Sequence, residues 1–372
     1  MSYNPATHSP DSSPSYDVFL SFAGPDREQG RRFYAHLGKA GLRVFFDEHS
    51  IEVGKSITAE IQHGISSSKL FVAYYSRHLT YRDACQAELC AAYIAAQQSG
   101  NSGRLIVINP EESTDHIFPK SLTDSEHLIS TASFMPNSTT WMTSITQAIS
   151  KQALSLDGGI GIVPNNHHPN RRGPRKFWTH NITRYPRLWD IHTALTDNNT
   201  GGLVKPEYSS VLVTGQPGVG KTSTVNRYIH YFGAAFSNVY WQQYDRSNSP
   251  LNIQQIGAAD QSDRFTLRVV DNIPADISLD DFHRLLPPAP NTCNILIGLN
   301  NRLQNILPTV TIEDLSPEEA RAFISRYRSP ESDTENEALD RLVDRMSRNA
   351  SIVHQMALKL EDMQGIISYD DL

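Results

Sequence analysis

The sequence predicts an α/β protein with two α/β units followed by a helical segment, and three observations support this architecture. Apolar runs that fit strands alternate with helical periodicity between Tyr16 and Gln152. The same alternation begins again near Phe177 and includes a glycine-rich loop between a strand and a helix. After about Ile312 the pattern is helical. Because strands that alternate with helices form parallel sheets covered by helices, both units are predicted to hold a parallel sheet.

The first unit contains four predicted strands separated by helices. The strands are DVFLSF (17–22), LRVFFD (42–47), KLFVAYYS (69–76) and RLIVIN (104–109). Helices are predicted over 26–40, from Ser56 to about 65, and over 83–98. Gly41 ends the first helix, and Ser56 caps the second, whose isoleucines recur every four residues on one face.

The second unit repeats this alternation before the sequence becomes helical. Its predicted strands are SVLVTG (210–215), RFTLRVVDN (264–272) and NILIGLN (294–300). Further along, Ser316, Pro317 and Glu319 occupy the N-cap, first-turn and capping-box positions of a helix. Two more helices are predicted at about 335–347 and 351–363.

Composition and charge exclude several classes of protein. The chain has 372 residues, of which 39% are apolar, so it is long and apolar enough to form sizeable cores and is not wholly disordered. Its net charge of −7 argues against general nucleic-acid binding. No apolar run approaches the roughly 20 residues that cross a bilayer, and the N-terminus does not resemble a signal peptide. Three scattered cysteines favour the reducing cytoplasm over a disulfide or zinc framework.

These patterns divide the chain into five parts. Residues 1–15 are rich in Ser, Pro and Asn and are predicted to be a flexible tail. Domains are predicted over 16–152 and 179–312, with a helical subdomain over 313–372. A segment rich in Gly, Pro and Asn makes 153–178 the predicted linker.

The segment GQPGVGKT, from Gly215 to Thr222, carries the clearest functional motif. It matches GxxxxGK[ST], follows a predicted strand and opens a predicted helix. Glycines let backbone N–H groups surround phosphate oxygens, and the helix N-terminus favours the negative charge. The predicted nucleotide-contacting residues here are Gly215, Gly218, Val219, Gly220, Lys221, Thr222 and Ser223. Lys221 is expected to reach the β- and γ-phosphates, and the Thr222 hydroxyl is expected to bind Mg²⁺.

The strand ending in VVDN supplies the expected partner of this loop. Asp271 ends that strand and is predicted to hold Mg²⁺ directly or through water. The next residue, Asn272, is an amide and therefore a poor base for activating water, which predicts slow hydrolysis. Because no NKxD-type guanine-reading motif is present, ATP and ADP are the expected nucleotides rather than GTP.

Residues from about 180 to 372 resemble the NB-ARC branch of the STAND ATPases, which are regulatory NTPases of immune receptors. GQPGVGKT and VVDN correspond to their Walker A and B motifs, and VTIEDLSPEEARAFI is similar to the segment entering the ARC subdomain. The resemblance implies an ATP/ADP switch and makes Arg302, after NILIGLNN, the candidate phosphate-sensing arginine. The family's Gly-Leu-Pro-Leu stretch is replaced by Asn349–Val353, and its adenine-side Gly-Arg motif is only hinted at near Ile182–Arg187.

Three segments of the first unit resemble the sequence boxes of the TIR domain, which has a flavodoxin-like fold. They are YDVFLSFAGPDR (16–27), FFDEHSIEVGKSI (45–57) and Ser76 followed by CQAEL (85–89). The resemblance implies either adaptor-like self-association or cleavage of NAD⁺ by the glutamate of a WCxxE motif, which is Glu88 here. It also implies NAD-binding roles for Phe22, Ala23, Asp47, Lys55 and Ser76. The family's tryptophan is replaced by Ala84.

Glu88 fits the chemistry that this resemblance implies. Breaking the nicotinamide–ribose bond develops oxocarbenium character, which a nearby carboxylate stabilises. The alternative is a solvated helix carboxylate without a catalytic role. Cys85 is a weak nucleophile candidate that fits better as a small buried residue.

The combined hypothesis is a nucleotide-switched defence protein. ATP-dependent oligomerisation would bring TIR domains together, and NAD⁺ would be hydrolysed or cyclised in an antiviral response. The expected partners are other copies of the chain and a separate sensor protein. No association with a membrane is expected. One alternative is a non-catalytic TIR interaction module on the same switch, and another is an ATPase motor, which Asn272 disfavours.

Overall fold

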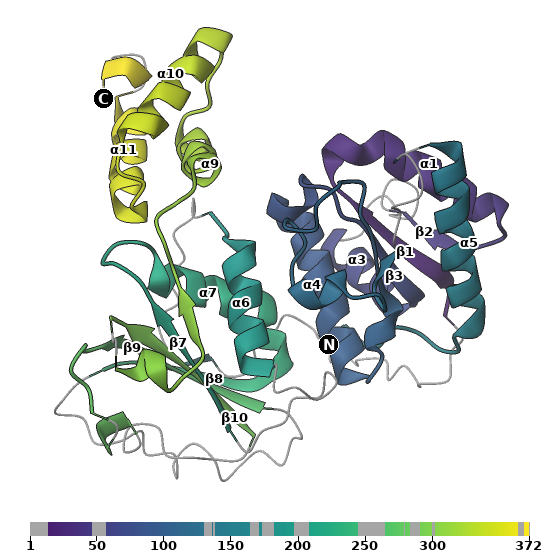
Figure 1. The fold of residues 1–372 in the computed structure, drawn as a ribbon, viewed down its shortest axis with the longest axis horizontal. Coiled ribbons are helices and arrows are strands. Elements are labelled where there is room, and N and C mark those ends of the chain that lie inside the picture. Colours follow the sequence, from purple (N-terminus) through teal and green to yellow (C-terminus); the bar gives the residue numbers. More distant parts are fainter. Residues whose placement is uncertain are drawn as a thin grey trace, which may run out of the picture. The chain divides into compact units, whose positions relative to one another are not determined.

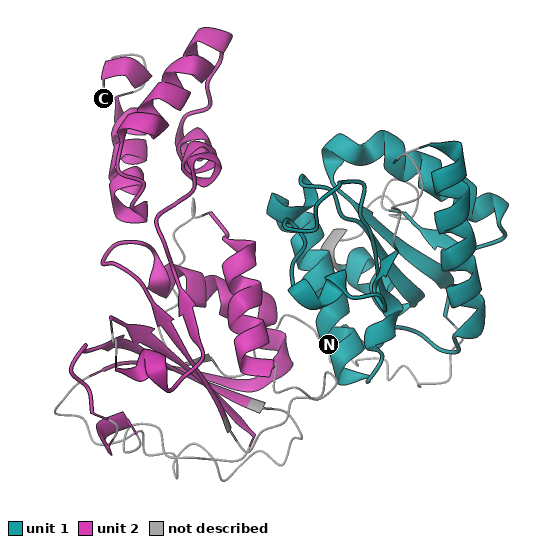
Figure 2. Cartoon of the chain, viewed as in Figure 1, with its two compact units in different colours: residues 1–165, 200–203 teal, residues 166–199, 204–372 magenta. Residues whose placement is uncertain are grey.

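The computed structural model divides the chain into two compact units (Figure 2). Unit 1 comprises Met1–Asn165 with Thr200–Leu203, and unit 2 comprises Asn166–Asn199 with Val204–Leu372. The residues that the structure describes are 14–46, 57–129, 136, 138–163, 171–172, 182–196, 208–244, 265–278, 280–282, 291–299, 302–363 and 368–371.

Unit 1 is built on a five-stranded parallel sheet with the order β2-β1-β3-β4-β5. The strands are β1 (Tyr16–Phe22), β2 (Val44–Phe45), β3 (Ser68–Tyr74), β4 (Leu105–Ile108) and β5 (Leu128–Ile129). This 2-1-3-4-5 order is the flavodoxin-like arrangement, in which the strand order reverses between β1 and β3.

Helices cover both faces of this sheet (Figure 1). They are α1 (Arg27–Lys39), α3 (Ile57–Ser66), α4 (Asp83–Gln98) and α5 (Thr139–Ser155). On one face, Phe33 of α1 and Trp141 of α5 pack in the cluster that includes Val18 and Leu20 of β1. On the other face, Phe19 of β1 stacks on Phe45 and Phe71 with ring centroids 5.0 and 5.4 Å apart. Alternate residues of β1 therefore face two different layers.

The packed chain of unit 1 continues past residue 152, where the first domain was predicted to end. Residues 153–155 belong to α5, and the buried Ile160 donates its N–H to the carbonyl of Ser68 at 2.9 Å. The Arg104 guanidinium also donates to the Gly158 carbonyl at 2.8 Å.

Unit 2 contains a six-stranded sheet with the order β11-β7-β10-β9-β8-β6, in which every pairing is parallel. The strands are β6 (Arg171–Arg172), β7 (Tyr208–Thr214), β8 (Phe236–Gln243), β9 (Phe265–Ile273), β10 (Thr292–Gly298) and β11 (Thr309–Thr311). Strand β7 lies between β10 and β11 and is therefore an interior strand of the sheet. The glycine-rich loop that follows it lies at the carboxyl ends of the strands, with a neighbouring strand on each side.

Two helices pack beside this sheet, and three more form the helical part of unit 2 (Figure 1). The first two are α6 (Tyr185–Thr196) and α7 (Lys221–Phe232), and the others are α9 (Pro317–Tyr327), α10 (Asp333–Arg345) and α11 (Ala350–Asp362). The predicted capping box of α9 is confirmed, because Ser316 and Glu319 exchange both hydrogen bonds. The last three helices bury their own apolar cluster around Leu339, Leu342 and Val353. Within the described part of the chain, every helix is too short or too polar to cross a membrane.

Candidate functional site

The loop between β7 and α7 has a backbone that only glycine adopts readily. Gly215, Gly218 and Gly220 have φ angles of 145°, 80° and 97°. A Cβ atom on Gly215 would lie 2.1 Å from the carbonyl oxygen of Ile312. The motif glycines are therefore required by both backbone conformation and close packing.

Lys221 and Thr222 begin α7 immediately after this loop. The Lys221 ammonium donates to the carbonyl oxygens of Gly215 at 2.8 Å and Gln216 at 2.9 Å, so the side chain curls back over its own loop. Burial lowers the pKa of Lys221, and the charge of Asp271 partly opposes this effect. This places a partly desolvated cation at the N-terminus of a helix, where an anion is favoured.

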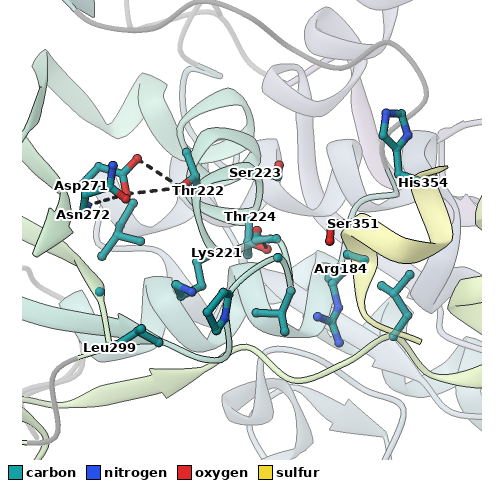
Figure 3. Close-up of a pocket in the computed structure, with 18 of the residues that line it drawn as sticks. Arg184, Lys221, Thr222, Ser223, Thr224, Asp271, Asn272, Leu299, Ser351 and His354 are labelled. Atoms are coloured by element: carbon teal, nitrogen blue, oxygen red, sulfur yellow. Dashed lines mark hydrogen bonds between the residues drawn. The ribbon is translucent and has the colours of Figure 1, made fainter. Parts of the chain in front are cut away.

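Asp271 lies near the end of β9, with only 2% of its surface exposed. Its carboxylate accepts hydrogen bonds from the Thr222 hydroxyl at 3.1 Å and the backbone N–H of Asn272 at 2.9 Å (Figure 3). It also accepts a hydrogen bond from the Gln243 amide at 3.3 Å. Asn272 has a φ of 61°, and its amide donates to the Gln243 side-chain oxygen at 2.6 Å. A hydroxyl beside a buried carboxylate is an oxygen donor set that fits Mg²⁺.

A pocket of about 570 Å³ extends from this loop toward the helical part of unit 2 (Figure 3). Its end at the loop is lined by Pro217–Thr224, Asp271–Ile273 and Ile297–Leu299. The other end is lined by Ile182, Arg184, Leu315, Phe323, Ala350, Ser351 and His354. The volume falls within the range of small-molecule sites. Lys221 and Asp271 supply charge at the loop end, and the other end combines apolar side chains with Arg184, Ser351 and His354.

The N-terminus of α11 contacts the glycine-rich loop directly. The Ser351 N–H donates to the Gly218 carbonyl at 2.9 Å, and the Asn349 side-chain amide donates to the Pro217 carbonyl at 3.0 Å. Asn349 also caps α11 by accepting from the Ser351 N–H. The residues at the start of α11 are thus hydrogen-bonded to the loop.

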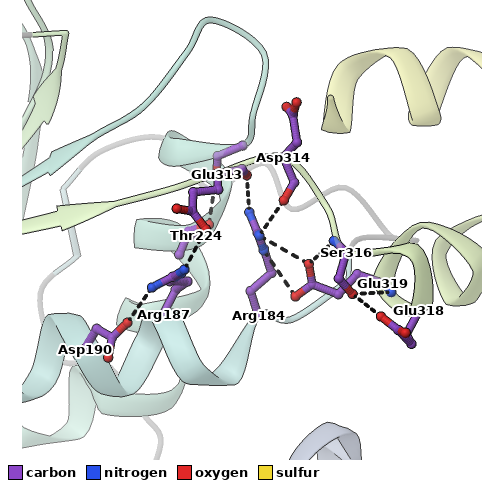
Figure 4. A network of polar contacts seen from close by, with 10 residues as sticks. Arg184, Arg187, Asp190, Thr224, Glu313, Asp314, Ser316, Glu318 and Glu319 are labelled. Atoms are coloured by element: carbon purple, nitrogen blue, oxygen red, sulfur yellow. Dashed lines mark hydrogen bonds and ion pairs between the residues drawn. The ribbon is translucent and has the colours of Figure 1, made fainter. Parts of the chain in front are cut away.

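Arg184 joins the chain before α6 to the segment between β11 and α9 (Figure 4). It donates to the carbonyl oxygens of Glu313 at 2.7 Å and Asp314 at 3.1 Å, and it forms a 3.2 Å ion pair with Glu319. Both side chains of the ion pair are about one-tenth exposed. Nearby, Arg187 bridges Asp190 and Glu313. The sequence hinted at this segment but gave no indication of its partners.

Most of the predicted nucleotide-contacting residues line this one pocket. Gly215 instead lines a second cavity of about 380 Å³, which shares Val219 and Leu299 with the first. Arg302 lies at the start of a short turn and is not among the described residues that line either cavity.

The candidate site of unit 1 lies where the strand order reverses. Glu88, on α4, is 9% exposed, and its carboxylate accepts a hydrogen bond of 2.6 Å from the hydroxyl of Ser21. Ser21 is the penultimate residue of β1 and pairs with Ala73 near the end of β3. Ligands of open parallel sheets bind in this crevice at the carboxyl ends of the strands.

Two further contacts hold the segments around Glu88. The Ser76 hydroxyl donates to the Asp26 carboxylate at 2.5 Å, and the Cys85 thiol donates to the Phe22 carbonyl at 3.3 Å. Ser76 is 3% exposed and Ala23 fully buried. Neither of these two predicted NAD-binding residues is therefore exposed to solvent.

Other residues considered for this site differ in how far they are buried. Burial raises the pKa of the Cys85 thiol to about 12, and the charge of Glu88 adds to this effect, so the thiol stays protonated. Tyr75 is fully buried, whereas Tyr81 is 56% exposed. Ala84 is exposed on the first turn of α4. Asp47 and Lys55 lie outside the described residues.

Comparison with known proteins identifies this region. The model of the TIR domain family matches residues 18–131. Unit 1 contains a TIR domain. Its three sequence boxes and its parallel sheet flanked by helices agree with this assignment.

Curated relatives match this chain over segments of 93 to 118 residues, close to the length of the matched TIR domain. The probable 2' cyclic ADP-D-ribose synthase TcpB of Brucella melitensis is 30% identical over 112 residues, which are 29% of this chain and 44% of the relative. The 2' cyclic ADP-D-ribose synthase AbTIR of Acinetobacter baumannii is 32% identical over 93 residues, covering 25% of this chain and 34% of the relative. The NAD(+) hydrolase PdTIR of Paracoccus denitrificans is 30% identical over 118 residues, covering 32% and 39%. The chain thus spans less than half the length of these relatives.

Proposed function

We propose that this chain is a nucleotide-switched defence protein whose TIR domain cleaves NAD⁺. The observation that carries the proposal is the Glu88 carboxylate, which lies at the carboxyl edge of β1 and is held there by Ser21. Relatives that align with this domain are named as NAD(+) hydrolases or 2' cyclic ADP-D-ribose synthases.

The chemistry follows from the charge of Glu88. Cleavage breaks the bond between ribose C1′ and the nicotinamide nitrogen, and neutral nicotinamide leaves with the bonding electrons. The positive charge that develops on the ribose is stabilised by a carboxylate that lies close to it. Water attack on C1′ gives ADP-ribose and a proton, whereas attack by another hydroxyl of the same molecule gives a cyclic product. In either case Glu88 orients the attacking oxygen, which belongs to water in the first reaction and to a hydroxyl group in the second.

Unit 2 is proposed to bind ATP and ADP in the 570 Å³ pocket. The glycine-rich loop and Lys221 would hold the phosphates, and the end near Phe323 would take the base. Thr222 and Asp271 would hold Mg²⁺, which neutralises phosphate charge when it is bound. On this assignment, 179–312 is a P-loop NTPase domain of the NB-ARC type and 313–372 is its ARC-like subdomain.

The switch is proposed to act through the contact between α11 and the glycine-rich loop. Ser351 and Asn349 bind the backbone of Gly218 and Pro217, so a change of nucleotide at the loop alters what α11 contacts. Exchange of ADP for ATP would release the helical part and allow copies of the chain to assemble through their TIR and nucleotide-binding domains. The trigger is proposed to be a separate sensor in the cytoplasm.

A second function is supported by one feature of the site. Ala84 stands where the TIR family has a tryptophan that could stack on nicotinamide, and it is exposed. In this alternative the TIR domain is a non-catalytic interaction module on the same ATP/ADP switch.

Nicotinamide release distinguishes the two functions. The full chain, concentrated and supplied with ATP and Mg²⁺, is incubated with NAD⁺ beside its Glu88→Gln and Glu112→Gln variants. Removing the Glu88 charge is expected to slow release by at least about 10²-fold, because a contact made mainly in the transition state is lost. Glu112 is exposed, and its variant should match the parent. NAD⁺ that stays intact with the parent would contradict the enzymatic function and favour the interaction module.

A further inference from the structure

The hydrogen bond between Ser21 and Glu88 joins a strand to a helix across 67 positions of sequence. Ser21 is 2% exposed and Glu88 9% exposed, so both groups are largely removed from water. Its length of 2.6 Å is that of a hydroxyl donating to an ionised carboxylate. Bonds of this type are among the stronger hydrogen bonds in proteins.

The position of Ser21 in β1 explains why its hydroxyl reaches α4. Val18 and Leu20 face the layer of α1 and α5, and Phe22 packs against the same cluster. The intervening Phe19 stacks on Phe45 and Phe71 on the opposite face. Ser21 continues this second face, so a hydroxyl replaces an apolar side chain at the strand end nearest Glu88.

We propose that Ser21 is a positioning residue for the reaction, which fixes the rotamer of the Glu88 carboxylate and stabilises its negative charge. The inference rests on the proposed NAD⁺ cleavage and adds a second residue to it. A glutamate side chain has three rotatable bonds, and a bond to one carboxylate oxygen removes most of their freedom. A hydrogen bond donated to a carboxylate also favours its ionised form, which is the form that stabilises a positive ribose.

One neighbouring contact helps to hold α4 but does not reach the carboxylate of Glu88. The Cys85 thiol of α4 donates to the Phe22 carbonyl at 3.3 Å. Loss of Ser21 should therefore leave α4 in place while the carboxylate loses this hydrogen bond. A residue that acts in this way affects turnover more than substrate binding.

The test compares Ser21→Ala with Ser68→Ala in the full chain with ATP and Mg²⁺. Ser68 is a matched control because it is also buried in a strand of the same sheet, and its hydroxyl also donates a 2.6 Å bond, to the Gly64 carbonyl. It begins β3, at the amino edge of the sheet, opposite the edge that holds Glu88. Nicotinamide release is measured as kcat and KM, and thermal melting reports folding.

We expect Ser21→Ala to lower kcat about tenfold or more while KM changes less than about threefold, since a bond to a charged group is lost. Ser68→Ala should lower kcat less than about twofold, and Ser21→Thr, which restores a hydroxyl, should recover most of the lost rate. Equal kcat in the two alanine variants would overturn the positioning role, as would an effect confined to KM. If Glu88→Gln is inactive while Ser21→Ala turns over like the parent, NAD⁺ cleavage stands and only this inference fails. If the parent leaves NAD⁺ intact, both fail.

Discussion

Thr222 Oγ1 lies 3.1 Å from Asp271 Oδ2, although the two residues are 49 positions apart in the sequence. The strand that precedes Thr222 and the strand that holds Asp271 are not neighbours in the sheet. Asp271 lies near the end of β9, and the strand before Thr222 is β7, with β10 between them. Helix α7 packs against β10 and so brings its first turn to the end of β9. The crossover that forms the sheet thus also places a hydroxyl beside a buried carboxylate.

This pair predicts a magnesium-dependent effect of Asp271→Asn. Asparagine has nearly the same shape but no charge, so ADP should raise the melting temperature by similar amounts in parent and variant when EDTA is present. Mg²⁺ should increase the ADP-induced shift of the parent alone, because a ligand that binds only the native state stabilises it. An equal increase in Asp271→Asn would show that this carboxylate does not hold the cation.

Lys221→Ala is expected to abolish stabilisation of unit 2 by ADP and ATP. The ammonium donates to two carbonyl groups of the loop and is partly desolvated, so its loss removes a strong attraction for phosphate. Thermal shift with ADP and Mg²⁺ measures the effect, and Lys359→Ala on the exposed side of α11 is the control. A full ADP-induced shift in Lys221→Ala would remove the phosphate assignment.

The elements that sequence analysis found are those with a local period. The strand predicted at 17–22 is β1, and the helix predicted at 83–98 is α4. Strands β5 and β11 have two and three residues, so they carry no period of their own and exist through pairing with β4 and β7. Helix α5 was missed although Ser138 caps it and its apolar residues have helical spacing.

The two candidate sites differ in how much of them could be predicted. The glycine-rich loop and the residues after it form one continuous motif, whose chemistry follows from residue type and spacing. The Arg184–Glu319 pair spans 135 positions and the Ser21–Glu88 pair spans 67. Partners this distant are chosen by the fold, and neither a serine in a strand nor an arginine before a helix indicates its partner by local pattern.

Gly218→Ala should displace α11 from the glycine-rich loop. At this position φ is 80°, and a Cβ atom would lie 2.6 Å from both Asn349 Oδ1 and Ser351 Oγ. ADP should bind at least about tenfold more weakly, equivalent to about 1.4 kcal/mol, because the loop must shift. Calorimetry measures the binding, and hydrogen exchange of the α11 amides reports its docking.

Gly41→Ala separates backbone strain from the clash at Gly218. Gly41 has a similar φ of 85° but nothing within 4 Å of a built Cβ. Its substitution should cost about 1–2 kcal/mol of stability from the left-handed conformation alone, without changing ADP affinity.

The prediction for Gly218→Ala is contradicted if the hydrogen exchange of the α11 amides is unchanged. That result would mean that the contact with the loop does not hold this helix.

The stability of unit 2 should fall in mild acid because of His192. This side chain of α6 is 2% exposed, and its ring stacks on Phe232 at 4.4 Å. Burial lowers the pKa of His192 from 6.5 to about 3. Between those values the unfolded chain binds a proton that the folded unit does not, so stability is full above about pH 6.5 and decreases as the pH falls toward 3. The slope is at most about 1.4 kcal/mol per pH unit, which gives about 2 kcal/mol between pH 6.5 and 5.

His192→Phe keeps an aromatic ring and removes the titration. Urea unfolding is followed at pH 7.5 and pH 5 by labelling the buried Cys293 of β10, with a disulfide reagent that reacts with thiols in acid. Cys85 and Cys90 report unit 1 in the same samples. Comparing parent with variant cancels the contributions of other titrating groups. The parent should lose about 2 kcal/mol more than the variant at Cys293 and no more at Cys85 or Cys90. Equal losses at Cys293 would show that His192 is protonated in the folded unit at pH 5.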